Sequence, residues 1–235
     1  MTQSTGNRVL LALPAAERRA VLDACAARRL ATGEVLARLG APAPALHFPE
    51  TAVISALATY GDGATIEMAN VGREACTGIG LILGRGTQLN TSQVQVGGAA
   101  LELPAARVAE LRDSLPAFRD ALFAAVQAVL FQVMVSGACN GAHSARQRLA
   151  RWLLTMQDRS DDETLPLTHE FLAGMLGVRR ATVTEAAAEL RRDGAITYGR
   201  GQVRIADRRR LRAASCECYD RVLEAGDSLL PRCGG

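Results

Sequence analysis

The stretch LTHEFLAGMLGVRRATVTEAAAELRRDGAI, residues 167–196, decides the fold, because it predicts a short helix, a glycine turn and a second helix rich in arginine. Thr168 can cap the first helix, and Gly177 supplies the turn between the two helices. The second helix carries a stripe with the i, i+4, i+7 spacing of a buried face, formed by Val183, Ala187 and Leu190. This order of elements is typical of a helix-turn-helix.

The outer face of the second helix is polar and basic. In a DNA-binding helix-turn-helix, the N-terminal end of the second helix meets the base edges in the major groove. That end carries Arg179 and Arg180 here, and we expect these two residues to read or anchor bases. The other candidate DNA contacts on the two helices are Thr168, Thr182, Thr184 and Glu185.

The segment AITYGRGQVRIAD, residues 195–207, predicts a β-hairpin around Gly199-Arg200-Gly201. A basic hairpin after a helix pair is the wing of a winged helix, in which Arg200 and Arg204 can reach phosphate beside the groove. The alternative is a plain helical hairpin with solvated arginines. Because the glycine turn, the arginine pair and the wing occur together and in order, the sequence favours DNA binding.

The basic residues are concentrated in the same region. Residues 1–139 are neutral, with 11 Arg and 11 acidic residues, whereas residues 140–214 carry 14 Arg and 9 acidic residues. All 27 basic residues are Arg, and the net charge of the chain is +3. A positive excess collected on the helix-turn-helix suits a module that faces phosphates, since released counterions drive non-specific binding.

The chain has 235 residues and 49% hydrophobic content, enough for a substantial core and for two domains. Its N-terminus shows no secretory signal, so we expect a cytoplasmic protein. The sequence also lacks a phosphate-cradling glycine loop, a zinc-hydrolase helix and a nucleophile elbow, so we expect no enzyme.

The uncharged segment 121–142 predicts a long buried helix rather than a membrane span, because Gln127, Gln132 and Asn140 interrupt it. It has two apolar stripes, which need two partners: the helix's own domain and the same helix of a second subunit. We assign the dimer interface to the first stripe, Phe118, Leu122, Val126, Val129 and Val133. The second stripe is Phe123, Leu130 and Met134. Enclosure of the helix in one core remains the alternative.

The first half of the chain predicts an antiparallel β-domain. Short runs such as TAVISALAT, ATIEMANV and SQVQV, between residues 45 and 103, are rich in β-branched residues. The turn Gly61-Asp62-Gly63 joins the first two runs as a hairpin. Recurrent glycines fit tight corners between short strands, as in a jelly roll or a small barrel. A preceding helix turns Val21, Leu22 and Cys25 towards this domain.

In this order of parts the chain resembles the superfamily of the cyclic AMP receptor protein and the fumarate-nitrate regulator (CRP/FNR), which are bacterial transcription factors. The resemblance implies an α+β chain with a β-roll in residues 1–110, a long dimerisation helix in 111–140 and a winged helix-turn-helix in 141–235. It implies double-stranded DNA, a second copy of the chain, RNA polymerase and a small-molecule effector as partners. Ala181 and Glu185 depart from the better-known recognition helices, so the operator cannot be copied from them.

Members of this family that bind cyclic nucleotides use a Gly-Glu pair, followed about eight residues later by an arginine that pairs with the cyclic phosphate. Here Ile79 follows Gly78, and Asn90 stands in the best-placed position for the arginine. Because an unpaired buried phosphate is costly, we expect no conventional cyclic AMP binding. Arg73 or Arg85 would have to compensate after rearrangement.

Six cysteines occur, at 25, 76, 139, 216, 218 and 233, and only Cys25 lies near the N-terminus, where the family's iron-sulfur members collect theirs. Cys216, Cys218 and Cys233 could bind zinc or sense redox state, but a CxC pair alone is a weak signal, so we interpret them as packing residues. The three histidines, His47, His143 and His169, show no partners in the sequence. We therefore assign no metal and no cofactor. The rival function is a non-catalytic scaffold, or a redox or metal sensor, whose helix-turn-helix contacts protein.

Overall fold

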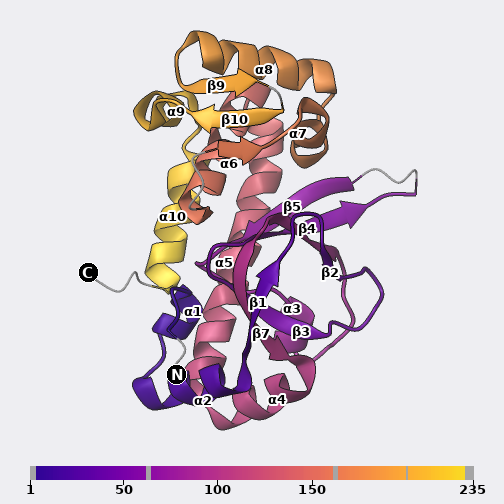
Figure 1. Ribbon diagram of the computed structural model, residues 1–235, viewed down its shortest axis with the longest axis vertical. Coiled ribbons are helices and arrows are strands. Elements are labelled where there is room, and N and C mark those ends of the chain that lie inside the picture. The colour runs from indigo at the N-terminus through magenta and orange to yellow at the C-terminus, as the bar shows by residue number, and fades with distance from the viewer. Residues whose placement is uncertain (1–3, 62–64, 161–163, 200, 231–235) are drawn as a thin grey trace.

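The computed structural model describes residues 4–61, 65–160, 164–199 and 201–230. Figure 1 shows a β-roll beside one half of a long helix, and a second domain stacked beyond the other half. The helices are α1 (Arg8–Leu11), α2 (Ala15–Ala24), α3 (Ile79–Ile82), α4 (Ala105–Ser114), α5 (Pro116–Ala142), α6 (Ala145–Arg159), α7 (His169–Leu176), α8 (Arg180–Arg192), α9 (Arg208–Ala214) and α10 (Cys218–Leu229). The strands are β1 (Ala26–Leu30), β2 (Val35–Ala37), β3 (Ala45–Pro49), β4 (Val53–Thr59), β5 (Thr65–Val71), β6 (Thr91–Val96), β7 (Gly98–Pro104), β8 (Thr164–Pro166), β9 (Ile196–Gly199) and β10 (Gln202–Ile205). The predicted α+β architecture is confirmed.

The β-roll consists of two antiparallel sheets, with strand orders β1-β7-β3 and β2-β6-β4-β5. Strand β6, TSQVQV, alternates buried and half-buried residues, as expected of a strand with one face in the core. Strands β4 and β5 pair from Thr59 opposite Thr65 to Ile54 opposite Val71, so the predicted pairing is confirmed. Asp62 and Gly63 of the predicted turn lie outside the described residues.

Helix α5 begins at Pro116. Proline is tolerated there because the backbone N–H groups of the first helical turn have no acceptor within the helix, so the missing N–H costs no hydrogen bond. Its predicted first stripe faces its own domain. Phe118 and Leu122 have no exposed surface and Val129 is 7% exposed, all within the core of the β-roll. The assignment of these three residues to a dimer interface is therefore wrong, because the β-roll already covers them. Val126 packs half-buried against the same core, whereas Val133 is 36% exposed.

The second stripe of α5 is the uncovered one. Phe123 is 44% exposed, Leu130 56% and Met134 62%. Among the described residues, α5 is also the helix that is long and apolar enough to cross a membrane, judged by length and composition only. That is weak evidence for a span, and one side of α5 is occupied by the β-roll and by α10.

The second domain begins with α6, whose start is fixed by a capping box: Ser144 accepts from the backbone of Gln147, and the Gln147 side chain accepts from the backbone of Ser144. Its core gathers α6, α7, α8 and α9 around side chains that are fully buried, including Leu149, Leu153, Leu154, Met156, Val183, Leu190 and Leu211. A small antiparallel sheet, β8-β10-β9, closes one side of this core.

The two domains meet through apolar side chains of the β-roll that join the core of the second domain, namely Val53, Leu57 and Val96, and through polar contacts of residues 67–74 with α6. The Glu67 carboxylate accepts from the Trp152 indole N–H at 2.8 Å and from the Asn70 amide at 2.8 Å. Arg159, at the end of α6, donates to the backbone oxygen of Asn70 at 3.0 Å and pairs with Glu74 at 2.7 Å. Burial raises the pKa of Glu67. These contacts fix the second domain against the edge of the β-roll.

The last helix, α10, runs back along α5 towards the N-terminus (Figure 1). At its far end, Arg8 forms an ion pair with Asp227 at 2.9 Å and donates to the backbone oxygen of Gly226 at 3.1 Å. Leu230 is buried in the same core as Phe118 and Leu122. The C-terminal end of the described chain is therefore part of the β-roll half of the molecule.

Candidate nucleic-acid interface

Helix α7 and the turn after it form as the sequence predicts. The Thr168 hydroxyl accepts from the backbone N–H of Phe171 at 3.1 Å, which caps α7. Gly177 ends the helix in the left-handed conformation, with φ of 61°, and Val178 then donates to the backbone oxygen of Ala173 at 3.1 Å. Because a side chain at this φ is strained, the glycine is needed where the chain reverses.

The buried face of α8 positions its outer face. Val183 and Leu190 have no exposed surface, and Ala187 is 4% exposed, so the predicted stripe is confirmed. Burial of each large aliphatic side chain of this kind contributes about 1.5–3 kcal/mol. The helix is therefore held firmly along its inner side, and its orientation relative to α7 is fixed.

The outer face of α8 is open to solvent. Arg179, Arg180, Thr184 and Glu185 are exposed, and Thr182 is half-buried. The N-terminal end of a helix has unpaired backbone N–H groups and a partial positive charge, which add to the charge of the two arginines. The structure thus brings the predicted residues of α8 together on one surface, and Thr168 lies exposed at the start of the neighbouring helix.

His169 connects this surface to the wing, a link that sequence reasoning missed. The Thr184 hydroxyl donates to the backbone oxygen of Arg180 at 3.1 Å, and the hydroxyl oxygen lies 2.9 Å from His169 Nδ1. The His169 ring also stacks on Tyr198 of β9, with ring centroids 4.4 Å apart. Burial, followed by the charge of Arg180, lowers the pKa of His169, which keeps the ring neutral near pH 7. The partners of His169 lie on α8 and β9, so no pattern in the sequence near His169 predicts these contacts.

The wing is a hairpin of β9 and β10, in which Val203 lies opposite Tyr198. Strand β8 adds a third strand, with Leu165 opposite Val203 on the other side. This strand was not predicted, because three residues carry too little pattern. Arg204 is exposed on β10, while the predicted wing contact Arg200 lies outside the described residues.

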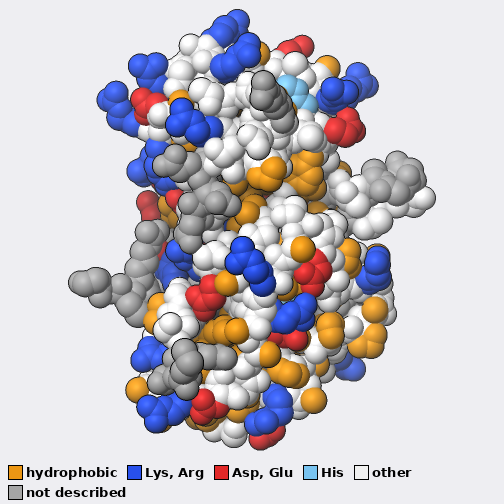
Figure 2. All heavy atoms as spheres, in the orientation of Figure 1, with side chains coloured by type: hydrophobic (Ala, Val, Ile, Leu, Met, Phe, Trp, Pro, Cys, Tyr) orange, Lys and Arg blue, Asp and Glu red, His pale blue; other side chains and the backbone are white. Residues whose placement is uncertain are grey.

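Figure 2 shows Arg side chains around the end of the molecule that carries α8, α9 and the wing. The exposed arginines there include Arg191 and Arg192 at the end of α8 and Arg209, Arg210 and Arg212 of α9. Some are paired: Arg212 lies 2.7 Å from Asp220, and Arg210 lies 3.2 Å from Asp207. The positive excess counted from the sequence is thus displayed on one end of the fold.

Residues 147–214 match the family described as a Crp-like helix-turn-helix domain. Solved structures extend the likeness over most of the chain. One is a CRP-family transcriptional regulator from Thermus thermophilus, with a TM-score of 0.66, 20% identity and coverage of 81% of this chain and 99% of that one. The chain has the CRP/FNR fold with a Crp-like helix-turn-helix. Within this fold, α8 is the second helix of the helix-turn-helix and β9-β10 is the hairpin that follows it.

Two further structures share the CRP/FNR fold with this chain. FixK2 from Bradyrhizobium japonicum has a TM-score of 0.68 at 16% identity and covers 82% of this chain and 98% of its own. The c-di-GMP-responsive regulator CLP from Xanthomonas campestris has a TM-score of 0.65 at 18% identity, with coverage of 83% and 100%. No curated protein matches the chain in sequence.

Proposed function

We propose that the chain is a sequence-specific transcription regulator that binds pseudo-palindromic operators as a homodimer. The observation that carries the proposal is the exposed, arginine-bearing end of α8, held above a fully buried inner face within a Crp-like domain. Two such helices would enter successive major grooves, about 34 Å apart. Arg179 and Arg180 would contact bases, while Thr168, Thr182 and Arg204 would hold the backbone, with Arg200 assigned the same role from sequence.

The exposed stripe of α5 supports dimerisation. Phe123, Gln127, Leu130, Met134 and Gly137 are all exposed and follow one another at alternating spacings of four and three residues. This spacing matches the seam of a two-stranded coiled coil, in which apolar residues repeat every 3.5 residues on average. We call these five positions the seam. A polar residue within such a seam, as at Gln127, fixes the register between the two helices. A second copy of α5 is therefore the partner that this face fits.

The β-roll supports control by something other than conventional cyclic AMP binding. Gly78 precedes α3 with φ of 84°, and Ile79 packs against the core in place of a carboxylate. Asn90 donates to the Ser92 hydroxyl at 3.3 Å and brings no positive charge. The effector would be a different small molecule, or the β-roll would serve only to hold the dimer. In this proposal the protein acts in the cytoplasm with RNA polymerase and has no catalytic role.

The test is a selection of genomic fragments by the purified protein, followed by titration of a selected site and a random duplex at several salt concentrations. Arg180→Ala should lose preference for the selected site, by about 1–3 kcal/mol, because a bidentate arginine contact to guanine discriminates by that amount. Arg204→Ala should weaken both duplexes equally and reduce the salt slope by about 1.

Arg107→Ala on α4 is the matched control, since Arg107 is exposed and pairs only with Glu110 of its own helix among the contacts described. It should leave the binding curves unchanged. If the protein is a folded dimer but binds neither duplex at low ionic strength, the proposal is overturned and the scaffold interpretation is favoured.

A further inference from the structure

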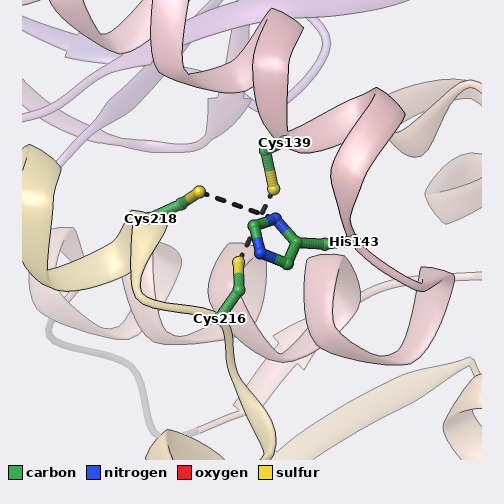
Figure 3. A group of neighbouring side chains, drawn as sticks. All are labelled: Cys139, His143, Cys216 and Cys218. Atoms are coloured by element: carbon green, nitrogen blue, oxygen red, sulfur yellow. Dashed lines mark hydrogen bonds between the residues drawn. The ribbon is translucent and has the colours of Figure 1, made fainter.

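Four metal-ligating side chains converge where α5 ends and α10 begins (Figure 3). Cys139 and His143 lie one turn apart at the C-terminal end of α5, where His143 is the C-cap. Cys216 and Cys218 flank Glu217, the N-cap of α10. Cys139, Cys216 and Cys218 are buried, which for Cys216 and Cys218 agrees with their interpretation as packing residues, whereas Cys233 lies outside the described residues. The sequence did not place Cys139 or His143 beside this pair.

We propose that Cys139, His143, Cys216 and Cys218 bind one zinc ion. The Sγ atoms of Cys139 and Cys216 lie 3.6 Å apart, and Cys218 Sγ lies 3.7 Å from His143 Nδ1. All four ligand atoms lie within 4.8 Å of one another. A tetrahedron with Zn–S bonds of about 2.3 Å has edges of about 3.8 Å, and Zn–N bonds of about 2.1 Å shorten the mixed edges slightly. The observed spacing therefore surrounds a single ion with little movement.

The chemistry of the ligands favours zinc. Thiolates and imidazole select zinc over hard cations such as Mg²⁺, and three cysteines with one histidine form a closed structural set. An iron-sulfur cluster spreads its four protein ligands over two or more iron atoms, so the whole set needs a wider spacing than a single ion does. The four ligands leave no open position, so the site is structural rather than catalytic.

The second ring nitrogen of His143 is also in place for a metal ligand. His143 Nε2 lies 3.2 Å from a carboxylate oxygen of Glu217, while Nδ1 faces the cysteines. Metal-binding histidines almost always donate their other N–H to a carboxylate, a backbone carbonyl or water, which fixes the tautomer and the ring orientation. The Cys139–Cys216 pair could form a disulfide on oxidation, but a disulfide would need neither His143 nor Glu217.

Two arginines of α6 offset the negative charge that the site would carry. A zinc ion with three thiolates and a neutral histidine has a net charge of −1, and Arg148 and Arg151 of α6 both interact electrostatically with the cysteines. The buried Nε groups of Arg148 and Arg151 have no hydrogen-bond partner among the described residues. Positive charge near a cysteine cluster stabilises thiolates, the form that binds a metal ion.

The ion would join α5 to the connection between α9 and α10. This inference does not rest on DNA binding, because it concerns how two parts of the chain are held together. An occupied site would fix the orientation of the C-terminal domain on α5 and add to folding stability by linkage.

The experiment uses untagged protein, purified in the presence of a reductant and dialysed, with its metal content measured by mass spectrometry. We expect one zinc per chain. After removal of zinc, Co²⁺ should give the intense visible bands and the sulfur-to-cobalt charge transfer of a tetrahedral thiolate site. Zinc added back should raise the melting temperature. These readouts need no variant, so a misfolded mutant cannot obscure the answer.

Cys216→Ser and His143→Gln should abolish stoichiometric zinc retention. Glu217→Gln, on a side chain 58% exposed, should weaken zinc binding by about 10- to 100-fold without unfolding the protein. Cys25→Ser is the matched control, because Cys25 lies outside the cluster, and it should retain zinc fully. Wild-type protein that holds no zinc and gives an octahedral Co²⁺ spectrum would overturn the proposal. A metal-free Cys139–Cys216 disulfide in freshly purified protein would overturn it too.

Discussion

Truncation of Leu130 to alanine tests whether the uncovered stripe of α5 is the dimer interface. Leu130 lies at the centre of the seam and is 56% exposed in the protomer. Complete burial of a leucine side chain contributes about 1.5–3 kcal/mol, so covering the exposed part is worth roughly 1–1.5 kcal/mol. A two-fold interface contains the residue twice, which gives about 2–3 kcal/mol per dimer and a rise in the dimer Kd of about 30- to 150-fold.

Sedimentation equilibrium over a range of protein concentrations measures this Kd directly. Leu89→Ala is the matched control, because Leu89 is 86% exposed on the β-roll and lies off the seam. It should leave the Kd unchanged. Leu122→Ala should behave differently again: Leu122 is fully buried in the protomer, so the change should lower the free energy of unfolding by about 2–5 kcal/mol.

Two outcomes would refute this reasoning. One is a Leu130→Ala protein that dimerises as tightly as the wild type. The other is a loss of dimer as large for Leu89→Ala as for Leu130→Ala, which would show that the effect does not come from the seam.

Three further predictions concern stability. Thr168→Ala should lower the free energy of unfolding, measured in urea, by about 1 kcal/mol because it removes the cap of α7, whereas Thr168→Ser should lower it much less. Equal decreases for the two variants would show that the hydroxyl of Thr168 does not stabilise α7. Burial lowers the pKa of His47, so the folded protein favours the neutral ring. The free energy that this ring contributes to folding is fully present above about pH 6.5, and it is lost as the pH falls through the lowered pKa of the folded state. His47→Gln should therefore flatten the fall in unfolding free energy on acidification, and an unchanged pH profile would count against it. Trp152→Phe should cost about 1–3 kcal/mol because Glu67 loses a donor, and a double-mutant cycle with Glu67→Gln should show that the two residues are coupled; additive losses would exclude the contact.

The helix-turn-helix could be predicted from sequence because all its signals are local. The cap Thr168, the turn residue Gly177 and the buried stripe of α8 fall within one stretch of residues 167–196, and each does in the structure what its chemistry indicates. Strand β8 could not be predicted, because it is short and gains its pairing only from β10.

The two stripes of α5 show a different limit. Helical periodicity reveals two apolar faces, but it carries no information about which partner covers which face. Phe118 and Leu122 proved to face the β-roll, and Leu130 faces solvent in the protomer. Only the packing of the β-roll against α5 decides between them.

The cysteine cluster escaped sequence reasoning for a similar reason. Cys216 and Cys218 form a weak CxC signal, and Cys139 with His143 forms a weak i, i+4 pair far away in the chain. Neither half predicts a site by itself. The return of α10 along α5 brings the halves together, and that return is a property of the tertiary fold.

Because α10 packs back along α5, residues 218–230 contribute to the stability of the β-roll half of the molecule. Arg8 of α1 forms an ion pair and a hydrogen bond with the end of α10, and Leu230 is buried in the β-roll core. Helices α1 and α10 therefore pack together beside α5. Removal of the residues after α9 would take away α10 and Leu230 and would expose part of the β-roll core to solvent. A shortened protein ending at residue 214 should therefore lose the packing of its β-roll before that of its helix-turn-helix domain.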